Sequence, residues 1–323
     1  MQPLYPEIKP YSRHRMSVGE VHQLYVDESG NPDGIPVVFL HGGPGAGCEF
    51  DSRRFFDPAR YRIVLVDQRG AGRSTPQGSL VDNTLAHLID DLVKLREFLA
   101  IEQWLVFGGG FGSALALAYA CRYPEHVLGL MLRGIFLGRV ADTNWIYKEG
   151  ASRFFPDAWA EFIAPLPAAS RSDPLKAYAQ LMQSNNEIQR MTAAKAWSLW
   201  EARCANLRPH SRLLDYVSAP QRALTRCVIA THYLINDCFL SPDELLNRVA
   251  AIADLPGIIV QGRFDVLTPM SNACELLDRW PGAELMVVRE AGHGVNDAAM
   301  IDALVSATRA FAAKIRPQHG RRS

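Results

Sequence analysis

The residues most informative about chemistry lie at 108–112, which read Gly-Gly-Gly-Phe-Gly. An apolar run, 104–107, precedes them, and a run rich in Ala and Leu follows at 113–119. A strand that turns sharply into a helix through G-x-S-x-G forms a nucleophile elbow, which exposes a serine hydroxyl at the turn. Residue 110 is glycine, which permits the turn but supplies no attacking group. We therefore expect no covalent acyl-enzyme at Gly110.

A second chemical signal is His41-Gly42-Gly43, directly after the apolar run 37–40. A loop of this kind can aim a backbone N–H at a developing oxyanion, and its glycines let a substrate approach closely. We expect the N–H groups of Gly43 and Phe111 to form an oxyanion hole, with His41 and Gly42 contacting the substrate. The competing interpretation is an ordinary tight turn, since such turns also contain glycine.

An acid and a histidine follow two later apolar runs. Asp265 comes after the run 258–260, and His293 comes after the run 285–288. In a catalytic triad the carboxylate fixes the imidazole tautomer and stabilises its protonated form. We predict a hydrogen-bonded dyad, although each residue taken singly also fits a turn or a surface loop. Ser113 lies one helical turn beyond the elbow, so we expect it to cap or pack rather than attack.

The elements that must position these residues are short apolar runs bounded by Gly and Pro. Runs that are apolar on both faces are typical of a parallel sheet covered by helices. Leucine and isoleucine at three- and four-residue spacing over 85–99 predict a crossover helix behind Thr84, and a final helix is expected near 301–314. The fold class is therefore α/β, with a mostly parallel, doubly wound sheet. The strand candidates are 37–40, 63–66, 105–107, 128–132, 258–260 and 285–288.

The strand signals stop between about residues 140 and 248, where aromatic and alanine residues recur at helical spacing and prolines interrupt the pattern. We predict a helical cap over 139–250, inserted into a core made of residues 1–138 and 251–323. The insertion follows a strand candidate and precedes another, which would lay the cap over the carboxyl ends of the strands. Open α/β sheets bind ligands at those ends.

Composition narrows the range of partners. The chain has 34 Lys and Arg against 34 Asp and Glu, so nothing favours a nucleic acid or an anionic membrane, and we expect a small molecule or short peptide. No segment resembles a membrane span, and residues 1–10 lack the apolar stretch of a signal peptide, so we expect a soluble cytoplasmic protein. Six cysteines without C-x-x-C spacing indicate reduced thiols, and we expect no metal site and no cofactor.

Longer segments resemble the bacterial proline iminopeptidases, serine peptidases of the α/β-hydrolase fold, over almost the whole chain. This resemblance implies an α/β-hydrolase fold with an inserted cap. It also implies that Gly110 stands at the nucleophile position, Phe111 at a tryptophan, and Asp265 and His293 at the other triad positions. The segments that carry it are 41–45 (HGGPG), 67–70 (DQRG), 73–76 (RSTP), 81–84 (VDNT), 132–136 (LRGIF), 149–153 (EGASR), 155–159 (FPDAW) and 195–198 (KAWS).

The cap holds a second departure from that family, which uses glutamates to hold the free amine of the substrate. Glu201 matches one of these glutamates. The other falls in a segment that here reads Ala230-Thr231-His232-Tyr233. Because residues 110, 111 and 230 all differ, the pattern favours natural divergence over a single inactivating substitution.

Three functions fit these residues. In the first, the chain is a diverged enzyme whose dyad acts as a general base, with water or substrate in the space at Gly110. In the second, it is a non-catalytic protein that holds a small ligand under the cap. In the third, it is a proline iminopeptidase inactivated at its serine. A pure binder has no chemical need for a hydrogen-bonded dyad that faces the pocket, which separates the second from the first.

The missing hydroxyl leads to a first prediction. Hydrolysis of a prolyl arylamide should be near background, because a triad without its nucleophile retains only roughly 10³–10⁴-fold acceleration over water. The measurement is release of the arylamine by protein free of host peptidases. Turnover at the rate of an intact serine peptidase would show that another group attacks.

Overall fold

The computed structural model describes residues 1–208 and 211–315 of the chain. Its centre is a sheet that, within these residues, has eight strands in the order β1-β2-β4-β3-β5-β6-β7-β8. β1 and β2 form an antiparallel hairpin, β2 pairs antiparallel with β4, and every later pairing is parallel. The strands are β1 (Ser12–Val18), β2 (His22–Gly30), β3 (Ile35–Leu40), β4 (Tyr61–Asp67), β5 (Trp104–Gly110), β6 (Val127–Ile135), β7 (Gly257–Gly262) and β8 (Ala283–Val288).

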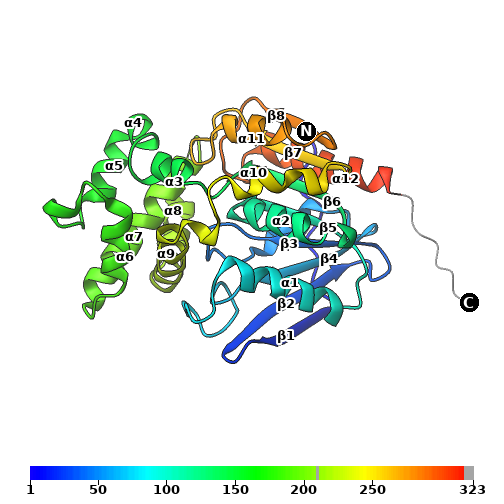
Figure 1. The fold of residues 1–323 in the computed structure, drawn as a ribbon, viewed down its shortest axis with the longest axis horizontal. Coiled ribbons are helices and arrows are strands. Elements are labelled where there is room, and N and C mark those ends of the chain that lie inside the picture. Colours follow the sequence, from blue (N-terminus) through cyan, green and yellow to red (C-terminus); the bar gives the residue numbers. More distant parts are fainter. Residues whose placement is uncertain (209–210, 316–323) are drawn as a thin grey trace, which may run out of the picture.

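Helices cover both faces of this sheet (Figure 1). Successive residues of a strand point to opposite faces, so Val38 and Leu40 of β3 pack with α1 and α2, whereas Val37 packs with α12. The predicted α/β class with a mostly parallel, doubly wound sheet is thus confirmed. The helices of the core are α1 (Leu85–Phe98), α2 (Phe111–Arg122), α10 (Glu244–Arg248), α11 (Met270–Leu277) and α12 (Ala298–Lys314).

All six strand candidates are strands in the structure, and the helices predicted near 85–99 and 301–314 are present as α1 and α12. The hairpin of β1 and β2 was not predicted. β1 buries alternate residues, Met16 and Val18, and β2 has polar residues among its buried ones, whereas the sequence criterion was a continuous apolar run. Alternation of this kind is typical of an antiparallel strand with one buried face.

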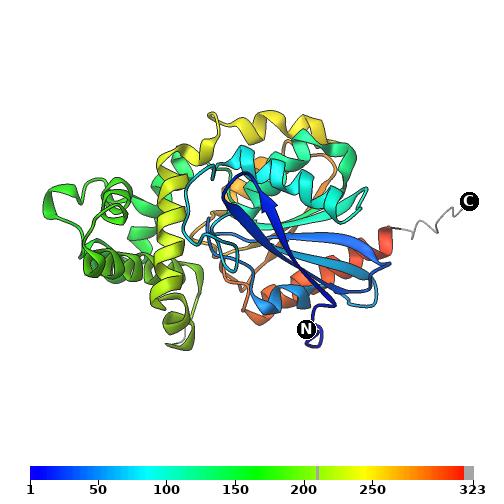
Figure 2. The same cartoon turned by 90° about the horizontal axis from the view of Figure 1, so that it is seen from below.

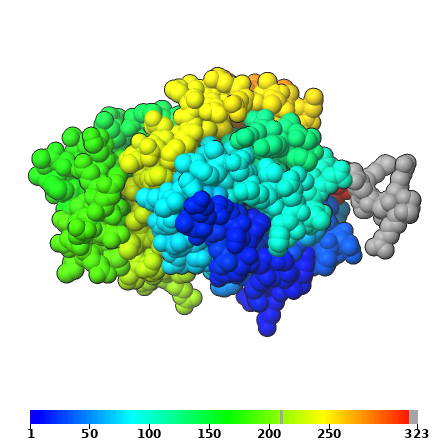
Figure 3. Space-filling model, turned by 60° about the horizontal axis from the view of Figure 1, so that its bottom comes forward, coloured from blue at the N-terminus to red at the C-terminus, as the bar shows by residue number. Residues whose placement is uncertain are grey.

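The segment after β6 forms a lobe of helices beside the core, which Figure 1 and Figure 3 show in green. Large aromatic side chains fill its interior, among them Trp197, Trp200 and Phe162, which are almost completely buried. At the end of the expected cap range, α10 and the short turn Val249–Ile252 pack against α2 of the core. The lobe contains α3 (Val140–Tyr147), α4 (Ala151–Phe154), α5 (Pro156–Ile163), α6 (Pro174–Met182), α7 (Glu187–Ala205), α8 (Ser211–Val217) and α9 (Pro220–Ile235).

Helix α9 runs along the boundary between this lobe and the core (Figure 2). Its attachment centres on Asn83, at the end of the loop that leads from β4 into α1. The Tyr233 hydroxyl donates to Oδ1 of Asn83 (2.8 Å), and His232 Nε2 lies 2.9 Å from the backbone oxygen of Asn83. The Asn83 amide donates in turn to the backbone oxygens of Arg69 and Ser79. One buried side chain thus holds the loop between β4 and α1 together and ties it to the cap helix.

No helix in the described ranges is long and apolar enough to cross a lipid bilayer.

This attachment predicts that Asn83→Ala will destabilise the protein by roughly 2–4 kcal/mol, because buried polar partners lose their hydrogen bonds. The measurement is the free energy of unfolding in urea. Gln77→Ala is the control, since Gln77 is an exposed amide, and it should cost roughly 0.5 kcal/mol or less. Equal losses in the two variants would contradict the role given to Asn83.

Candidate active site

The elbow predicted from the sequence is the turn from β5 into α2. Gly110 occupies it with φ +57° and ψ −126°, a backbone conformation that L side chains rarely adopt. A Cβ placed on Gly110 would lie 3.5 Å from Nε2 of His293, which is an ordinary contact distance. The turn therefore has the strained geometry of a nucleophile elbow, and its open side faces the imidazole.

At the neighbouring positions 108, 109 and 112, glycine is explained by close packing and not by the backbone conformation. A Cβ on Gly108 would lie 2.2 Å from the backbone oxygen of Gly112, and a Cβ on Gly112 would lie 2.2 Å from that of Leu40. A Cβ on Gly109 would lie 2.5 Å from Nε of Arg133. At Gly108 and Gly112 the backbone excludes any side chain, and at Gly109 a side chain would displace the guanidinium of Arg133. At Gly110 the space is available, so packing does not explain the glycine.

The loop at 41–45 lies against this elbow. A Cβ on Gly42 would be 2.8 Å from the backbone oxygen of Gly109 and 3.8 Å from the backbone nitrogen of Phe111. Phe111 is the first residue of α2, so its N–H has no partner within the helix. Gly43 follows with φ +116°, which suits glycine. The structure thus brings the two predicted oxyanion elements together.

The ring of His41 braces the loop. Nε2 accepts a hydrogen bond from the backbone N–H of Gln68 (3.0 Å), and Nδ1 lies 3.0 Å from the backbone oxygen of Gly42. The residue is buried, and this burial lowers the pKa of the imidazole below its usual value. Both ring nitrogens therefore have backbone partners, and neither is left for the substrate contact expected from the sequence.

Asp265 and His293 meet at the same end of the sheet. Nδ1 of His293 lies 2.9 Å from Oδ2 of Asp265, in a pair whose carboxylate is almost completely buried. Thr268 supports the carboxylate through its hydroxyl (2.8 Å) and its backbone N–H (2.8 Å), and Gln261 donates to it at 3.2 Å. This network fixes the carboxylate, which in turn orients the imidazole so that Nε2 faces Gly110.

Two residues at the end of β6 hold the histidine from the other side. Nη1 of Arg133 donates to the backbone oxygen of His293 (2.8 Å), and burial lowers the pKa of this guanidinium to about 10. Gly134 has φ +52°, and a Cβ there would lie 2.7 Å from Cε1 of His293. Neither residue, nor Thr268 or Gln261, has a role predicted from the sequence. The available signal was a charged residue and a glycine at the end of an apolar strand.

Ser113 does not replace the missing hydroxyl. Its Oγ donates to the backbone oxygen of Gly110 (2.6 Å) and accepts from the backbone N–H of Phe136 (3.1 Å). The side chain is fully buried. It therefore joins the elbow to the end of β6, as the packing interpretation predicted.

Glu201 lies in the cap and is almost completely buried. Its Oε1 accepts hydrogen bonds from the Tyr147 hydroxyl (2.5 Å) and from Nε1 of Trp197 (3.0 Å). Burial, followed by the nearby Glu201 charge, raises the pKa of the Tyr147 phenol, which therefore stays neutral and able to donate. On the other carboxylate oxygen, Nη2 of Arg226 lies at 2.6 Å. Arg226 is a partner that the sequence analysis did not find.

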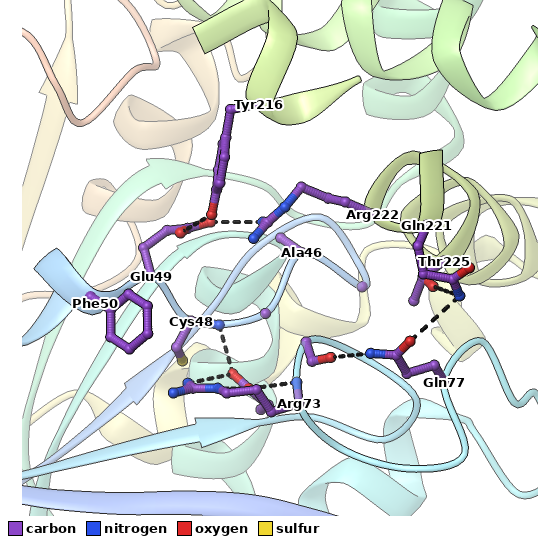
Figure 4. Close-up of a pocket in the computed structure, with 14 residues that line it drawn as sticks. Ala46, Cys48, Glu49, Phe50, Arg73, Gln77, Tyr216, Gln221, Arg222 and Thr225 are labelled. Carbon is purple, nitrogen blue, oxygen red and sulfur yellow. Dashed lines mark hydrogen bonds and ion pairs between the residues drawn. The ribbon is translucent and has the colours of Figure 1, made fainter. Parts of the chain in front are cut away.

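A cavity of about 290 Å³ opens where the loop 45–50 meets α8 and α9 of the cap (Figure 4). Across it, Glu49 of the core accepts hydrogen bonds from Arg222 (2.9 Å) and from the Tyr216 hydroxyl. Neither Gly110 nor His293 lines this cavity. It is a polar contact zone between the cap and the core. Among the described residues, no group of three or more His, Cys, Asp or Glu side chains is placed to hold a metal ion.

Comparison with known proteins identifies the family of this chain. Residues 35–297 match the family model described as alpha/beta hydrolase fold. A proline iminopeptidase from Xylella fastidiosa (strain Temecula1) is 47% identical over 312 residues, which cover 96% of this chain and 100% of that protein. One from Arabidopsis thaliana is 47% identical over 306 residues, covering 94% of this chain and 80% of that protein. The chain belongs to the proline iminopeptidase family.

Solved structures show the same fold at lower sequence identity. A proline iminopeptidase-related protein from Thermus thermophilus has a TM-score of 0.64 at 23% identity, covering 95% of this chain and 100% of that one. An esterase from Rhodococcus sp. ECU1013 has a TM-score of 0.64 at 18% identity, covering 94% and 100%. This member of the proline iminopeptidase family is therefore an α/β hydrolase in fold.

The packing of Gly134 against the imidazole predicts that Gly134→Ala will displace the His293 ring. Its cost should exceed that of Gly78→Ala by roughly 1–3 kcal/mol, because forcing atoms into a packed site strains it. Gly78 is the matched control. Its φ is also positive, at +71°. A Cβ on Gly78 would have no heavy atom of the described residues within 4 Å.

The measurements are urea unfolding and the downfield proton resonance of the bond between His293 and Asp265. Gly134→Ala should remove that resonance, and Gly78→Ala should keep it. An unchanged resonance in a folded Gly134→Ala variant would show that the ring does not depend on this glycine.

Proposed function

We propose that this protein is a diverged enzyme of the proline iminopeptidase family, in which the dyad of His293 and Asp265 acts as a general base without a serine nucleophile. The observation that supports this most directly is the free side of the imidazole. Nδ1 is held by Asp265 at 2.9 Å, while Nε2 faces the open space at Gly110. A water molecule or a substrate hydroxyl in that space would lie where a serine hydroxyl otherwise would.

The proposed reaction is a direct attack on an activated acyl or amide-containing small substrate. Nε2 of His293 takes the proton of the attacking oxygen, that oxygen bonds to the carbonyl carbon, and the carbonyl electrons move onto its oxygen. The N–H groups of Gly43 and Phe111 stabilise this oxyanion. As the tetrahedral species collapses, the imidazolium returns the proton to the leaving group. Asp265 stabilises the imidazolium throughout.

The retained support of the dyad favours an enzyme over a non-catalytic binder. Asp265 has four donors around it in Thr268, Gln261 and His293. A buried carboxylate with this arrangement is costly unless its partners are all in place. A protein that merely holds a ligand gains nothing from orienting the imidazole toward an empty elbow.

The names of the relatives suggest an alternative function. The proteins that are 47% identical to this chain are named proline iminopeptidases, so N-terminal proline release is the second candidate. The glycine at the elbow weighs against it, because a positioned histidine supplies only roughly 10²–10⁴-fold acceleration. That suffices for an activated acyl group and falls short of routine amide hydrolysis.

The proposal is tested by comparing the wild type with His293→Asn on a panel of activated esters, lactones and prolyl amides. Turnover of at least one activated acyl substrate should fall by roughly 10²–10⁴-fold in the variant. The binding constant of that substrate should change little, since Asn keeps most of the volume. If turnover of every substrate in the panel is independent of His293, the general-base proposal is wrong and a non-catalytic binding protein is the better interpretation.

The open space at the elbow predicts that Gly110→Ser will produce ester hydrolysis. A serine Cβ would sit 3.5 Å from Nε2, which brings its hydroxyl within hydrogen-bond reach of the imidazole. The substitution should cost roughly 1–3 kcal/mol of stability because of the positive φ. Burst kinetics with a p-nitrophenyl ester would report the acyl-enzyme, and Gly110→Ala is the control for strain without the hydroxyl.

A folded Gly110→Ser variant that hydrolyses no ester would contradict the assignment of the elbow, the dyad and the oxyanion loop as one site.

A further inference from the structure

The carboxylate of Glu201 is buried inside the cap. It is 4% exposed and lies among aromatic rings, with Tyr147 and Trp197 both donating to Oε1. Those two neutral donors leave the negative charge itself uncompensated. A carboxylate removed from water in this way requires a cation close by.

The protein supplies that cation itself. Nη2 of Arg226 lies 2.6 Å from Oε2 of Glu201, the oxygen that neither Tyr147 nor Trp197 contacts. Arg226 stands on α9, which packs directly against α7, the helix that carries Glu201. Its side chain is 23% exposed, so it borders space that solvent or a ligand can reach. The pair is neutral as a whole.

Both helices of this pair continue to the proposed catalytic residues. The backbone oxygen of Ala205, one turn after Glu201 on α7, accepts a hydrogen bond from the N–H of Gly294 (2.7 Å), next to His293. Tyr233, two turns after Arg226 on α9, packs its ring 5.0 Å from the ring of Phe111. The two helices that carry the ion pair therefore also contact the loop of His293 and the elbow residue Phe111.

The helix face that carries Arg226 has no carboxylate one turn further on. Residue 230, one turn further along α9, is a fully buried alanine. An ammonium group entering here would find the Glu201 charge already paired and a guanidinium beside it. It would lose its own hydration without gaining a counter-charge.

We propose that Arg226 is a specificity-determining residue, whose guanidinium occupies the Glu201 carboxylate in place of a ligand's ammonium group. The site then selects substrates that are uncharged or acylated at the end under the cap, and it rejects free N-terminal amines. This inference rests on the proposed function for the location of the substrate. It reverses the amine preference that the resemblance implies for Glu201.

The test measures binding and needs no turnover. The probes are L-prolinamide, which carries a free amine, and N-acetyl-L-prolinamide, which does not. Their dissociation constants are measured by calorimetry or NMR titration for the wild type, Arg226→Met and Arg226→Lys. Methionine keeps the aliphatic length and removes the charge, and lysine keeps the charge. The double variant Arg226→Met with Glu201→Gln controls for the carboxylate.

The wild type should bind the acetylated probe at least as tightly as the free amine. Arg226→Met should shift the ratio toward the free amine by about tenfold or more, since it leaves Glu201 free to pair with the ammonium. Arg226→Lys should keep the wild-type ratio, and the double variant should lose the gain. Arg226→Gln is measured in parallel, because its amide can still donate to Glu201 if the methionine variant fails to fold.

Two results would overturn the inference. One is a wild type that prefers the free amine by about tenfold or more, which requires no variant. The other is a folded Arg226→Met or Arg226→Gln variant that gains no binding of L-prolinamide. Either result leaves the general-base proposal intact, because that proposal depends on turnover and on His293. Conversely, turnover independent of His293 would leave this ligand preference standing.

Discussion

The close approach of backbone to backbone at the elbow is the constraint on which the rest of this structure depends. Gly112 lies so near the carbonyl of Leu40, and Gly42 so near that of Gly109, that a side chain at either position would overlap a main-chain atom. Interiors packed at this density leave no room to adjust. The end of β3, the loop that follows it and the turn from β5 into α2 are therefore locked together. These contacts set the loop at 41–45 beside the N-terminus of α2.

The imidazole is held against this rigid frame from several directions. Asp265 fixes Nδ1, Arg133 holds the backbone of the histidine loop, and Gly134 leaves room for the ring at the end of β6. The cap takes part as well, since α7 accepts a hydrogen bond from Gly294. The strands β6 and β7 and the histidine loop thus meet at one point, which is the carboxyl end of a parallel sheet. Side chains from distant parts of a chain converge there in such sheets.

The cap contributes chemistry of a different kind. Its interior is aromatic, and the buried charges of Glu201 and Arg226 compensate each other within it. Across the boundary, Asn83 and Glu49 of the core join α9 and α8 through hydrogen bonds and an ion pair. Charges at such a boundary decide which ends of a substrate can be desolvated, because a buried group needs a partner of opposite sign. In the proposals made above, the elbow acts in bond making, and the pair of Glu201 and Arg226 acts in the selection of substrates.

The sequence by itself determined the parallel strands, the elbow at 108–112 and the order of Asp265 and His293, because apolar runs and glycine-rich turns are local signals. It could not give the hairpin of β1 and β2 by the same criterion, since one-sided burial depends on neighbouring strands. The bracing of His41 by Gln68 and the pairing of Arg226 with Glu201 were decided by tertiary structure. Both unite residues from different elements, and nothing in local spacing says which buried charge or ring nitrogen another segment will meet.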